Sequence, residues 1–280
     1  MPNINREHYD AVYRKVNVSD LIEKVKNFSA LLEDITKTDT SWFGLYHDNF
    51  EKRLNGTKIL ELGAGNGLNA LIMASLGAKV TALDISGEST NLIRKASVEL
   101  GLTEKVEAMT VNFLEEKYYP ESFDFIVGKA FLHHLTSEHI ERYLAKISGL
   151  LRKSGEARFF EPAVNSRFLD AVRWVIPVQG RPSSLSKKTF AAWKKADPHP
   201  ESSYSSEYYS AVGKRYFDEI NIIPVGGIER LHRLLPAGPL NRSFRRLALQ
   251  SEHVLPYALR LKIARAQTII LRRPRQTNAS

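Results

Sequence analysis

Cysteine is absent from this chain of 280 residues. Neither a disulfide framework nor a thiolate metal site can therefore form, and cysteine usage gives no information about the redox compartment. No cluster of other metal ligands stands out, so we expect no bound metal. No run approaches the roughly 20 apolar residues of a membrane-spanning helix, and the N-terminal residues lack an apolar segment of signal-peptide length. We therefore expect a cytoplasmic protein.

Acidic residues are scarce in one part of the chain, its C-terminal end. Residues 228–280 contain eleven Lys/Arg and two Asp/Glu, while the rest of the chain is balanced in charge. A uniformly basic chain would suggest nucleic acid, whereas a neutral body with a basic end suggests a local anionic contact or a solvated face. Three interpretations of residues 228–275 stay open: a solvated packing face, a peripheral contact with an anionic membrane, and a contact with an anionic acceptor or nucleic acid.

The basic segment also has a helical pattern. Its apolar residues recur at three- and four-residue intervals between arginines, which predicts amphipathic helices with cationic flanks. These apolar residues are Leu231, Leu234, Leu235, Leu240, Phe244, Leu247 and Ala248.

Short apolar runs alternate with helical patterns through the middle of the chain. The runs at 57–62, 78–85, 105–113, 123–130 and 156–163 predict buried strands, and the patterns at 67–76, 89–100 and 137–151 predict helices, the last with Ser137 as its N-cap. This alternation is typical of parallel βαβ units in a doubly wound α/β sheet. Two later runs, 215–225 and 266–274, predict a closing hairpin at one edge. We therefore expect a seven-stranded, mostly parallel sheet with helices on both faces.

Three segments lie outside that alternation. Residues 1–54 are expected to form a helical lid, with two helices within 5–37, in front of a Rossmann-like domain at 55–280. The domain is expected to carry insertions at about 162–212 and 227–264, neither with the pattern of a core. The first insertion offers aromatic residues for a lid and a His/Tyr group that we expect in a solvated loop. The lid candidates are Phe168, Trp174, Phe190 and Trp193, and the loop group is His199, Tyr204, Tyr208 and Tyr209.

The glycine-rich stretch ELGAGNG at 61–67 falls between the first predicted strand and the first helix. Ligands bind at this edge of open α/β sheets, and glycine lets the backbone approach them closely. The dinucleotide fingerprint would need glycine at position 68, which is Leu68, and no P-loop pattern exists. Glu61 would repel a pyrophosphate and attract an ammonium group. Asp84, which ends the second predicted strand, can bind both hydroxyls of a ribose.

A ligand with an ammonium group, a ribose and an adenine is S-adenosylmethionine, and the chain resembles the class I S-adenosylmethionine-dependent methyltransferases. The resemblance covers about 55–165 and implies a Rossmann-like fold and this cofactor, while saying little about the methyl acceptor. It rests on four motifs in the family's order and spacing, which are ELGAGNG (61–67), LDIS (83–86), VNFLE (111–115) and FDFIVGKAFLHHL (123–135).

The resemblance also implies the residues that bind the cofactor. Glu61 would orient the glycine loop or face the ammonium group, and Asp84 would bind the ribose. Asn112 stands where the family usually has an aspartate that bonds the adenine amino group; its carbonyl can accept that bond without the charge. The full set is Glu61, Gly63, Ala64, Gly65, Asp84, Ile85, Ser86, Asn112, Phe113, Gly128 and Lys129.

Methyl transfer from a sulfonium is an in-line displacement that needs positioning, desolvation and, for a weakly acidic nucleophile, a base. His133 and His134 follow the fourth predicted strand, and Glu161 ends the fifth, so these three are the candidates for the base. Tyr9 and Tyr13 lie four residues apart on a predicted helix and could close over the sulfonium or belong to the core.

The preferred hypothesis is methyl transfer to O, N or C of a small organic metabolite. A lipid-soluble acceptor at the membrane surface, an RNA methyltransferase and a non-enzymatic cofactor-binding protein are the alternatives.

Overall fold

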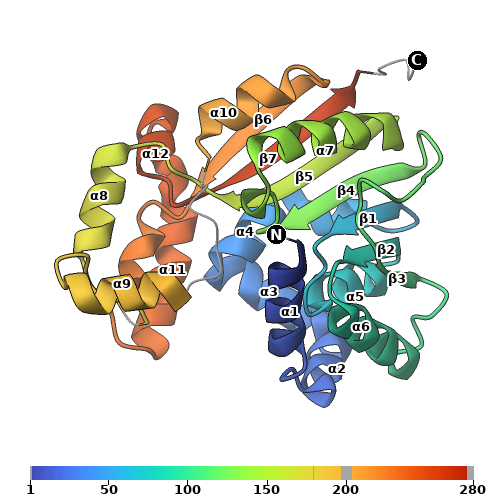
Figure 1. The fold of residues 1–280 in the computed structure, drawn as a ribbon, viewed down its shortest axis with the longest axis horizontal. Coiled ribbons are helices and arrows are strands. Elements are labelled where there is room, and N and C mark those ends of the chain that lie inside the picture. Colours follow the sequence, from blue (N-terminus) through green and yellow to red (C-terminus); the bar gives the residue numbers. More distant parts are fainter. Residues whose placement is uncertain (1, 179, 197–203, 276–280) are drawn as a thin grey trace.

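Seven strands form one sheet in the order β3-β2-β1-β4-β5-β7-β6 (Figure 1). The computed structural model describes residues 2–178, 180–196 and 204–275. Strands β1 to β5 pair in parallel, and β7 is antiparallel to both β5 and β6. The predicted mostly parallel sheet with a closing hairpin is thereby confirmed. The strands are β1 (Lys58–Leu62), β2 (Lys79–Asp84), β3 (Val106–Thr110), β4 (Phe123–Lys129), β5 (Leu151–Pro162), β6 (Phe217–Val225) and β7 (Ala266–Pro274).

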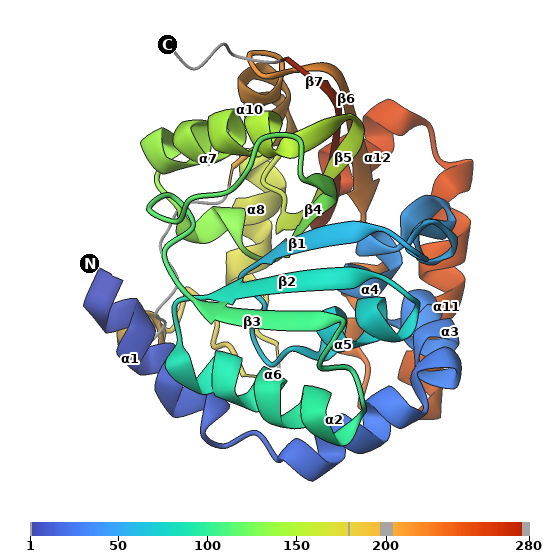
Figure 2. The same ribbon diagram turned by 90° about the vertical axis from the view of Figure 1, so that its right-hand side faces the viewer.

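Two hydrophobic clusters cover opposite faces of this sheet, because successive side chains of a strand point to opposite faces. In β1, Ile59 belongs to the cluster packed by α5 and α6, while Leu60 and Leu62 belong to the cluster packed by α7 and α10. Figure 2 shows the two helix layers on either side of the strands. The helices are α5 (Leu68–Ser75), α6 (Gly87–Glu99), α7 (Ser137–Leu150) and α10 (Ser206–Gly213).

The N-terminal segment forms α1 (Pro2–Tyr13), α2 (Val18–Lys26), α3 (Phe28–Thr38) and α4 (Thr40–Leu45), followed by the 3-10 helix η1 (His47–Arg53). The expectation of two helices within 5–37 is wrong, because polar residues break the pattern. Asn17 accepts a bond from the Ser19 amide to start α2, Asn27 ends it, and Asp39 caps α4. Helices α2 to α4 bury their apolar faces in the core, through Leu21, Val25, Leu32, Trp42 and Leu45.

Two element boundaries also differ from the sequence pattern. Helix α7 is capped by Thr136, whose hydroxyl accepts a bond from the His139 amide, and not by Ser137. Strand β3 ends at Thr110, so Asn112 and Phe113 lie in the loop that follows it.

The first insertion contains α8 (Arg167–Val175), α9 (Lys187–Ala196) and α10, and the second contains η3 (Glu229–Leu234), α11 (Pro239–Ser251), η4 (Glu252–Val254) and α12 (Tyr257–Ile263). The expectation that neither contributes to the core is wrong. Tyr209 and Val212 of α10 are buried against the sheet, and so is Leu249 of α11. Helices α8 and α9 stand beyond the carboxyl ends of β4 and β5 (Figure 1). His199 lies outside the described residues.

The arginines of α11 are engaged in ion pairs. Arg242 and Arg246 pair with Asp34 of α3, and Arg245 pairs with Glu229 at 2.6 Å. The predicted amphipathic stripe is divided, because η3 is a 3-10 helix and α11 begins only at Pro239. In the part of the chain that the structure describes, no helix is long and apolar enough to cross a membrane.

Candidate functional site

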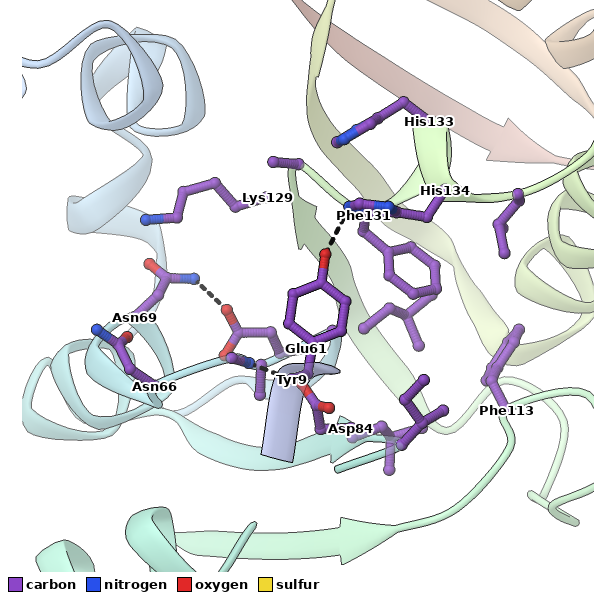
Figure 3. A pocket seen from close by; sticks show the side chains of 18 of the residues that line it. Tyr9, Glu61, Asn66, Asn69, Asp84, Phe113, Lys129, Phe131, His133 and His134 are labelled. Atoms are coloured by element: carbon purple, nitrogen blue, oxygen red, sulfur yellow. Dashed lines mark hydrogen bonds between the residues drawn. The ribbon is translucent and has the colours of Figure 1, made fainter. Parts of the chain in front are cut away.

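A cavity of about 410 Å³ lies at the carboxyl ends of β1, β2 and β4, roofed by α1 (Figure 3). This volume falls within the roughly 300–1,000 Å³ of small-molecule sites. Eight of the eleven predicted cofactor residues line it: Glu61, Gly63, Ala64, Gly65, Asp84, Ile85, Phe113 and Lys129. Tyr9, Tyr13, His133 and His134 line it as well.

The glycine loop needs glycine for two separate reasons. Gly63, Gly65 and Gly67 have φ of 69°, 59° and 77°, a left-handed conformation that other residues rarely adopt. A Cβ on Gly63 would lie 2.6 Å from Cδ2 of Phe131, and one on Gly67 would lie 2.3 Å from Cγ1 of Ile93. The loop therefore presents bare backbone to the cavity.

Glu61 is a buried carboxylate in the cavity wall, 2% exposed. Its Oε1 accepts a bond of 2.7 Å from Nδ2 of Asn69, whose Oδ1 accepts one of 2.8 Å from the hydroxyl of Tyr46. Its Oε2 has no hydrogen-bond partner among the described residues. Burial raises the pKa of Glu61 to about 7, against the opposing effects of the Asn69 bond and the charge of Lys129.

Asp84 connects the glycine loop to the start of α6. Its Oδ2 accepts a bond of 2.9 Å from the Gly65 amide, and its Oδ1 accepts one of 2.9 Å from the Ser86 amide. Burial raises the pKa of Asp84, and these backbone bonds oppose the rise. Each carboxylate oxygen retains a further lone pair for a ligand.

Ser86, Asn112 and Gly128 are the predicted cofactor residues that do not line the cavity. Ser86 caps α6, because its hydroxyl accepts a bond from the Ser89 amide and donates to Asp10 of α1 at 2.5 Å. Gly128 packs against Phe159, whose Cδ1 would lie 2.8 Å from an added Cβ.

Asn112 is exposed, and its side chain makes hydrogen bonds within its own turn. Its Oδ1 accepts a bond of 3.2 Å from the Leu114 amide, and its Nδ2 donates one of 2.7 Å to Glu115. Val111 and Phe113, on either side of it, line the cavity in its place.

Glu161 is fully buried at the end of β5 and does not line the cavity. Its carboxylate accepts bonds from the backbone amides of Phe131, Leu132 and His133 at 2.9, 2.7 and 3.2 Å. It also contacts Nδ1 of His133 at 2.8 Å. Glu161 therefore anchors the turn after β4, which continues into the 3-10 helix η2 (Leu132–His134).

His133 and His134 lie side by side on that turn, with ring centroids 4.0 Å apart. Because a carboxylate only accepts hydrogen bonds, Glu161 fixes the proton of neutral His133 on Nδ1 and leaves the lone pair on Nε2. Nε2 of His134 lies 3.4 Å from the hydroxyl of Tyr9, which projects from α1 across the cavity (Figure 3). The Tyr9 ring is stacked on that of Tyr13, with centroids 6.0 Å apart. The structure thus brings both histidines and both tyrosines to one side of the cavity.

Sequence reasoning missed nine residues of the cavity wall, among them Asn69, Phe131 and Tyr143. Asn69 has a weak signal, since it occupies the first turn of the helix that follows the glycine loop. Tyr143 has no local signal, because only the packing of α7 brings it to Phe131 and Phe113.

A mostly parallel sheet with a glycine loop after its first strand and an acidic residue ending its second is typical of Rossmann-like proteins, which bind nucleoside-containing ligands at this edge of the sheet. Residues 59–155 match the family described as a methyltransferase domain. The matched stretch, 97 of the 280 residues, contains all four motifs by which the chain resembles the class I S-adenosylmethionine-dependent methyltransferases, and the match supports that resemblance.

Curated relatives are similar over part of the chain. The ubiquinone biosynthesis O-methyltransferase of Burkholderia vietnamiensis is 29% identical over 106 residues, which cover 38% of this chain and 43% of that protein. The enzyme of the same name from Xanthomonas euvesicatoria pv. vesicatoria is 35% identical over 82 residues, or 29% of this chain and 34% of that protein. The similarity thus spans less than half of these relatives.

Solved structures are similar over more of the chain. Geranyl diphosphate C-methyltransferase from Streptomyces coelicolor A3(2) has a TM-score of 0.52 at 12% identity, covering 80% of this chain and 73% of that one. Phosphoethanolamine N-methyltransferase 2 of Haemonchus contortus, solved with S-adenosyl-L-methionine, has a TM-score of 0.53 at 14% identity, covering 93% and 60%. At this identity the likeness establishes the fold alone.

Proposed function

We propose that this protein transfers the methyl group of S-adenosylmethionine to O, N or C of a small organic molecule. The observation that carries the proposal is Glu61, a buried carboxylate in the cavity wall whose Oε2 has no partner among the described residues. A buried charge without a partner is costly, and an ammonium group is the partner that a carboxylate binds best. The methyltransferase names of the relatives and structural neighbours support the same function.

The residues that line the cavity support this proposal, because they would suit each part of the cofactor. Glu61 would face the ammonium group, the bare backbone of the glycine loop would lie along the methionine and ribose, and Asp84 would accept bonds from the ribose hydroxyls. Phe113 and Ile85 would flank the adenine. Helix α1 serves as the lid of the N-terminal segment, since Tyr9 and Tyr13 line the cavity while α2 to α4 are part of the core.

The bound cofactor supplies an electrophilic methyl group on a sulfonium. The chain must then position the acceptor, exclude water and accept a proton. We assign the proton to Nε2 of His133, because Glu161 fixes the opposite nitrogen as the donor. Glu161 is a positioning residue, since it does not reach the cavity.

The proposed function is tested by incubating the purified protein with methyl-labelled S-adenosylmethionine and a metabolite extract. We expect label in a small molecule, and mass spectrometry would identify it. If the protein binds the cofactor but labels nothing in the metabolite extract, nor in lipid and RNA extracts tested in parallel, the enzymatic proposal fails and the non-enzymatic alternative is supported.

The affinity for S-adenosylmethionine should depend on pH through Glu61. The pKa of Glu61 is raised to about 7, so below pH 7 the side chain is increasingly protonated and loses its charge for the ammonium group. Affinity should therefore fall on acidification, towards a limit of about tenfold per pH unit. It should also fall above about pH 8, where an α-amino group loses its own proton.

Calorimetric titrations from pH 5.5 to 8.5 measure this dependence. Glu61→Gln keeps the shape of the side chain. In this variant the affinity should be lower at pH 7.5 and should no longer fall as the pH is lowered below 7. An acid limb of the same steepness in the variant would show that another group is responsible.

A lipid-soluble acceptor at a membrane surface is a second candidate, favoured by exposed apolar residues of the second insertion. Leu231, Leu234, Leu240 and Leu247 are exposed by 50%, 59%, 68% and 66%. The arginines of α11 are ion-paired to the protein, so we place the contact on these leucines and not on the arginines.

This candidate predicts that the protein floats with both neutral and anionic liposomes, with little dependence on salt because the contact is apolar, and that Leu240→Ser with Leu247→Ser removes the binding. Both side chains are largely exposed, so the double variant should remain folded. Absence of flotation under all lipid and salt conditions would reject the membrane candidate and leave a soluble acceptor.

A further inference from the structure

A second cavity, of about 220 Å³, lies between the two insertions. Five arginines line it: Arg173, Arg181, Arg230, Arg233 and Arg265. They come from α8, from the turn after it, from η3 and from the residue before β7. The rest of the wall is aliphatic, with leucine, isoleucine and valine side chains from α8, from the residues just after it and from η3.

The positive charge of this cluster is only partly compensated. Arg173 pairs with Asp170 at 3.2 Å, and Arg265 lies 3.8 Å from Glu229, which also pairs with Arg245. Arg230 and Arg233 make no ion pair among the described residues, so two carboxylates face five guanidinium groups.

Arg181 is the most deeply placed of the five, with 6% of its surface exposed. A turn at Gly180, with φ of 78°, brings it beneath the end of α8, where its Nη2 donates to the carbonyls of Arg173 and Ile176. Through these bonds, one nitrogen of the guanidinium group caps the C-terminal end of α8. The other two, Nε and Nη1, are buried without an acceptor among the described residues.

The electrostatics agree with the geometry. Burial and the charges of Arg173, Arg233 and Arg230 lower the pKa of Arg181 to about 10. Burial and neighbouring arginines lower the pKa of Arg230 and of Arg233 as well. All remain protonated at neutral pH, so their mutual repulsion is a cost that a bound anion would remove.

We propose that this cavity is a binding site for an amphipathic anion, a phosphate or carboxylate group attached to an apolar chain. The arginines bind the anionic group, and guanidinium groups are well suited to its oxygens. The aliphatic wall takes the first carbons of the chain. The volume is below that of a complete ligand site, and the half-exposed Leu231 and Leu234 at its rim let the remainder of the chain leave the cavity.

Hexyl phosphate is the probe, titrated by calorimetry without S-adenosylmethionine, so the result does not depend on the proposed function. We expect saturable binding that is at least about tenfold tighter than for inorganic phosphate, and no binding of hexanol. The double variant Arg230→Gln with Arg233→Gln should bind hexyl phosphate at least about tenfold more weakly. These side chains are partly exposed and make no ion pair among the described residues, and their removal relieves repulsion, so the variant should not have a lower thermal midpoint than the wild type.

Arg167→Gln is the matched control, because Arg167 is exposed on α8 and does not line the cavity. It removes one positive charge and should leave the affinity for hexyl phosphate unchanged. No saturable binding, or equal affinity in the double variant and the wild type, would overturn the proposal.

Vesicles of phosphatidylcholine with and without phosphatidic acid separate the two sources of such an anion. Binding to hexyl phosphate and to the anionic vesicles, lost from both in the double variant, identifies a lipid headgroup. Binding to hexyl phosphate alone identifies a free amphiphile.

Discussion

Replacement of Asp84 by alanine should weaken S-adenosylmethionine binding by about one to two decades, or roughly 1.5 to 3 kcal/mol. Two effects combine in this loss. The ribose hydroxyls lose their charged acceptor, and the Gly65 amide loses the carboxylate oxygen that holds the glycine loop at 2.9 Å. Calorimetry measures the affinity, and an unchanged dissociation constant would contradict the assignment of the ribose site.

Asp20→Ala is the control for this variant, because Asp20 is an exposed aspartate in the first turn of α2 and does not line the cavity. It should leave the affinity for the cofactor unchanged. Gly65→Leu should act in the same direction as Asp84→Ala for a steric reason, since its Cβ would lie 3.2 Å from the hydroxyl of Tyr13 and its side chain would fill the ribose region.

Replacement of His133 by glutamine should lower turnover by about 10²-fold or more while leaving the affinity for S-adenosylmethionine within about threefold. The imidazole is the group that Glu161 orients at the edge of the cavity, and glutamine can keep a hydrogen bond to Glu161 without acting as a base. Single-turnover rates and calorimetry on the same preparation separate the two quantities.

His139→Gln is the matched control, because His139 lies outside the cavity on α7 and contacts Thr136. It should have wild-type turnover. If His133→Gln keeps full activity, the reaction depends on positioning alone and the proton goes elsewhere. Glu161→Gln is a less specific probe, since its amide would face backbone donors and should also lower the thermal midpoint.

The sheet was predictable from the sequence because parallel strands that are buried on both faces have nearly continuous apolar sequences. TKILEL and FDFIVGKA contain such runs, and both form central strands. The N-terminal helices were not divided correctly, since Asn27 ends one helix and precedes the next without a change in the apolar spacing.

The site residues were predictable where the neighbouring sequence alone determines their position. Glu61 and the glycine loop lie at the end of β1, and the motif ELGAGNG contains both the end of the strand and the loop. Asn112 was not predictable in this way. It occupies the position of the family's adenine-binding aspartate, but its side chain accepts a hydrogen bond within its own turn. Glu161 was placed correctly at a strand end, but the three amides that it binds come from a turn 28 to 30 residues earlier.

The arginine cluster was beyond sequence reasoning for a related reason. Arg181 and Arg233 belong to different insertions, and nothing in their local sequences indicates that they meet. The arginines of the two insertions come together in one cavity only because α8 packs beside η3.

The central claim is that the cavity at the glycine loop holds S-adenosylmethionine. Its most direct test is a calorimetric titration of the wild-type protein with this ligand at pH 7.5. We predict saturable binding with one site per chain and competition by S-adenosylhomocysteine at the same site. No detectable binding at ligand concentrations up to about 1 mM, the upper end of ordinary substrate affinities, would contradict the account.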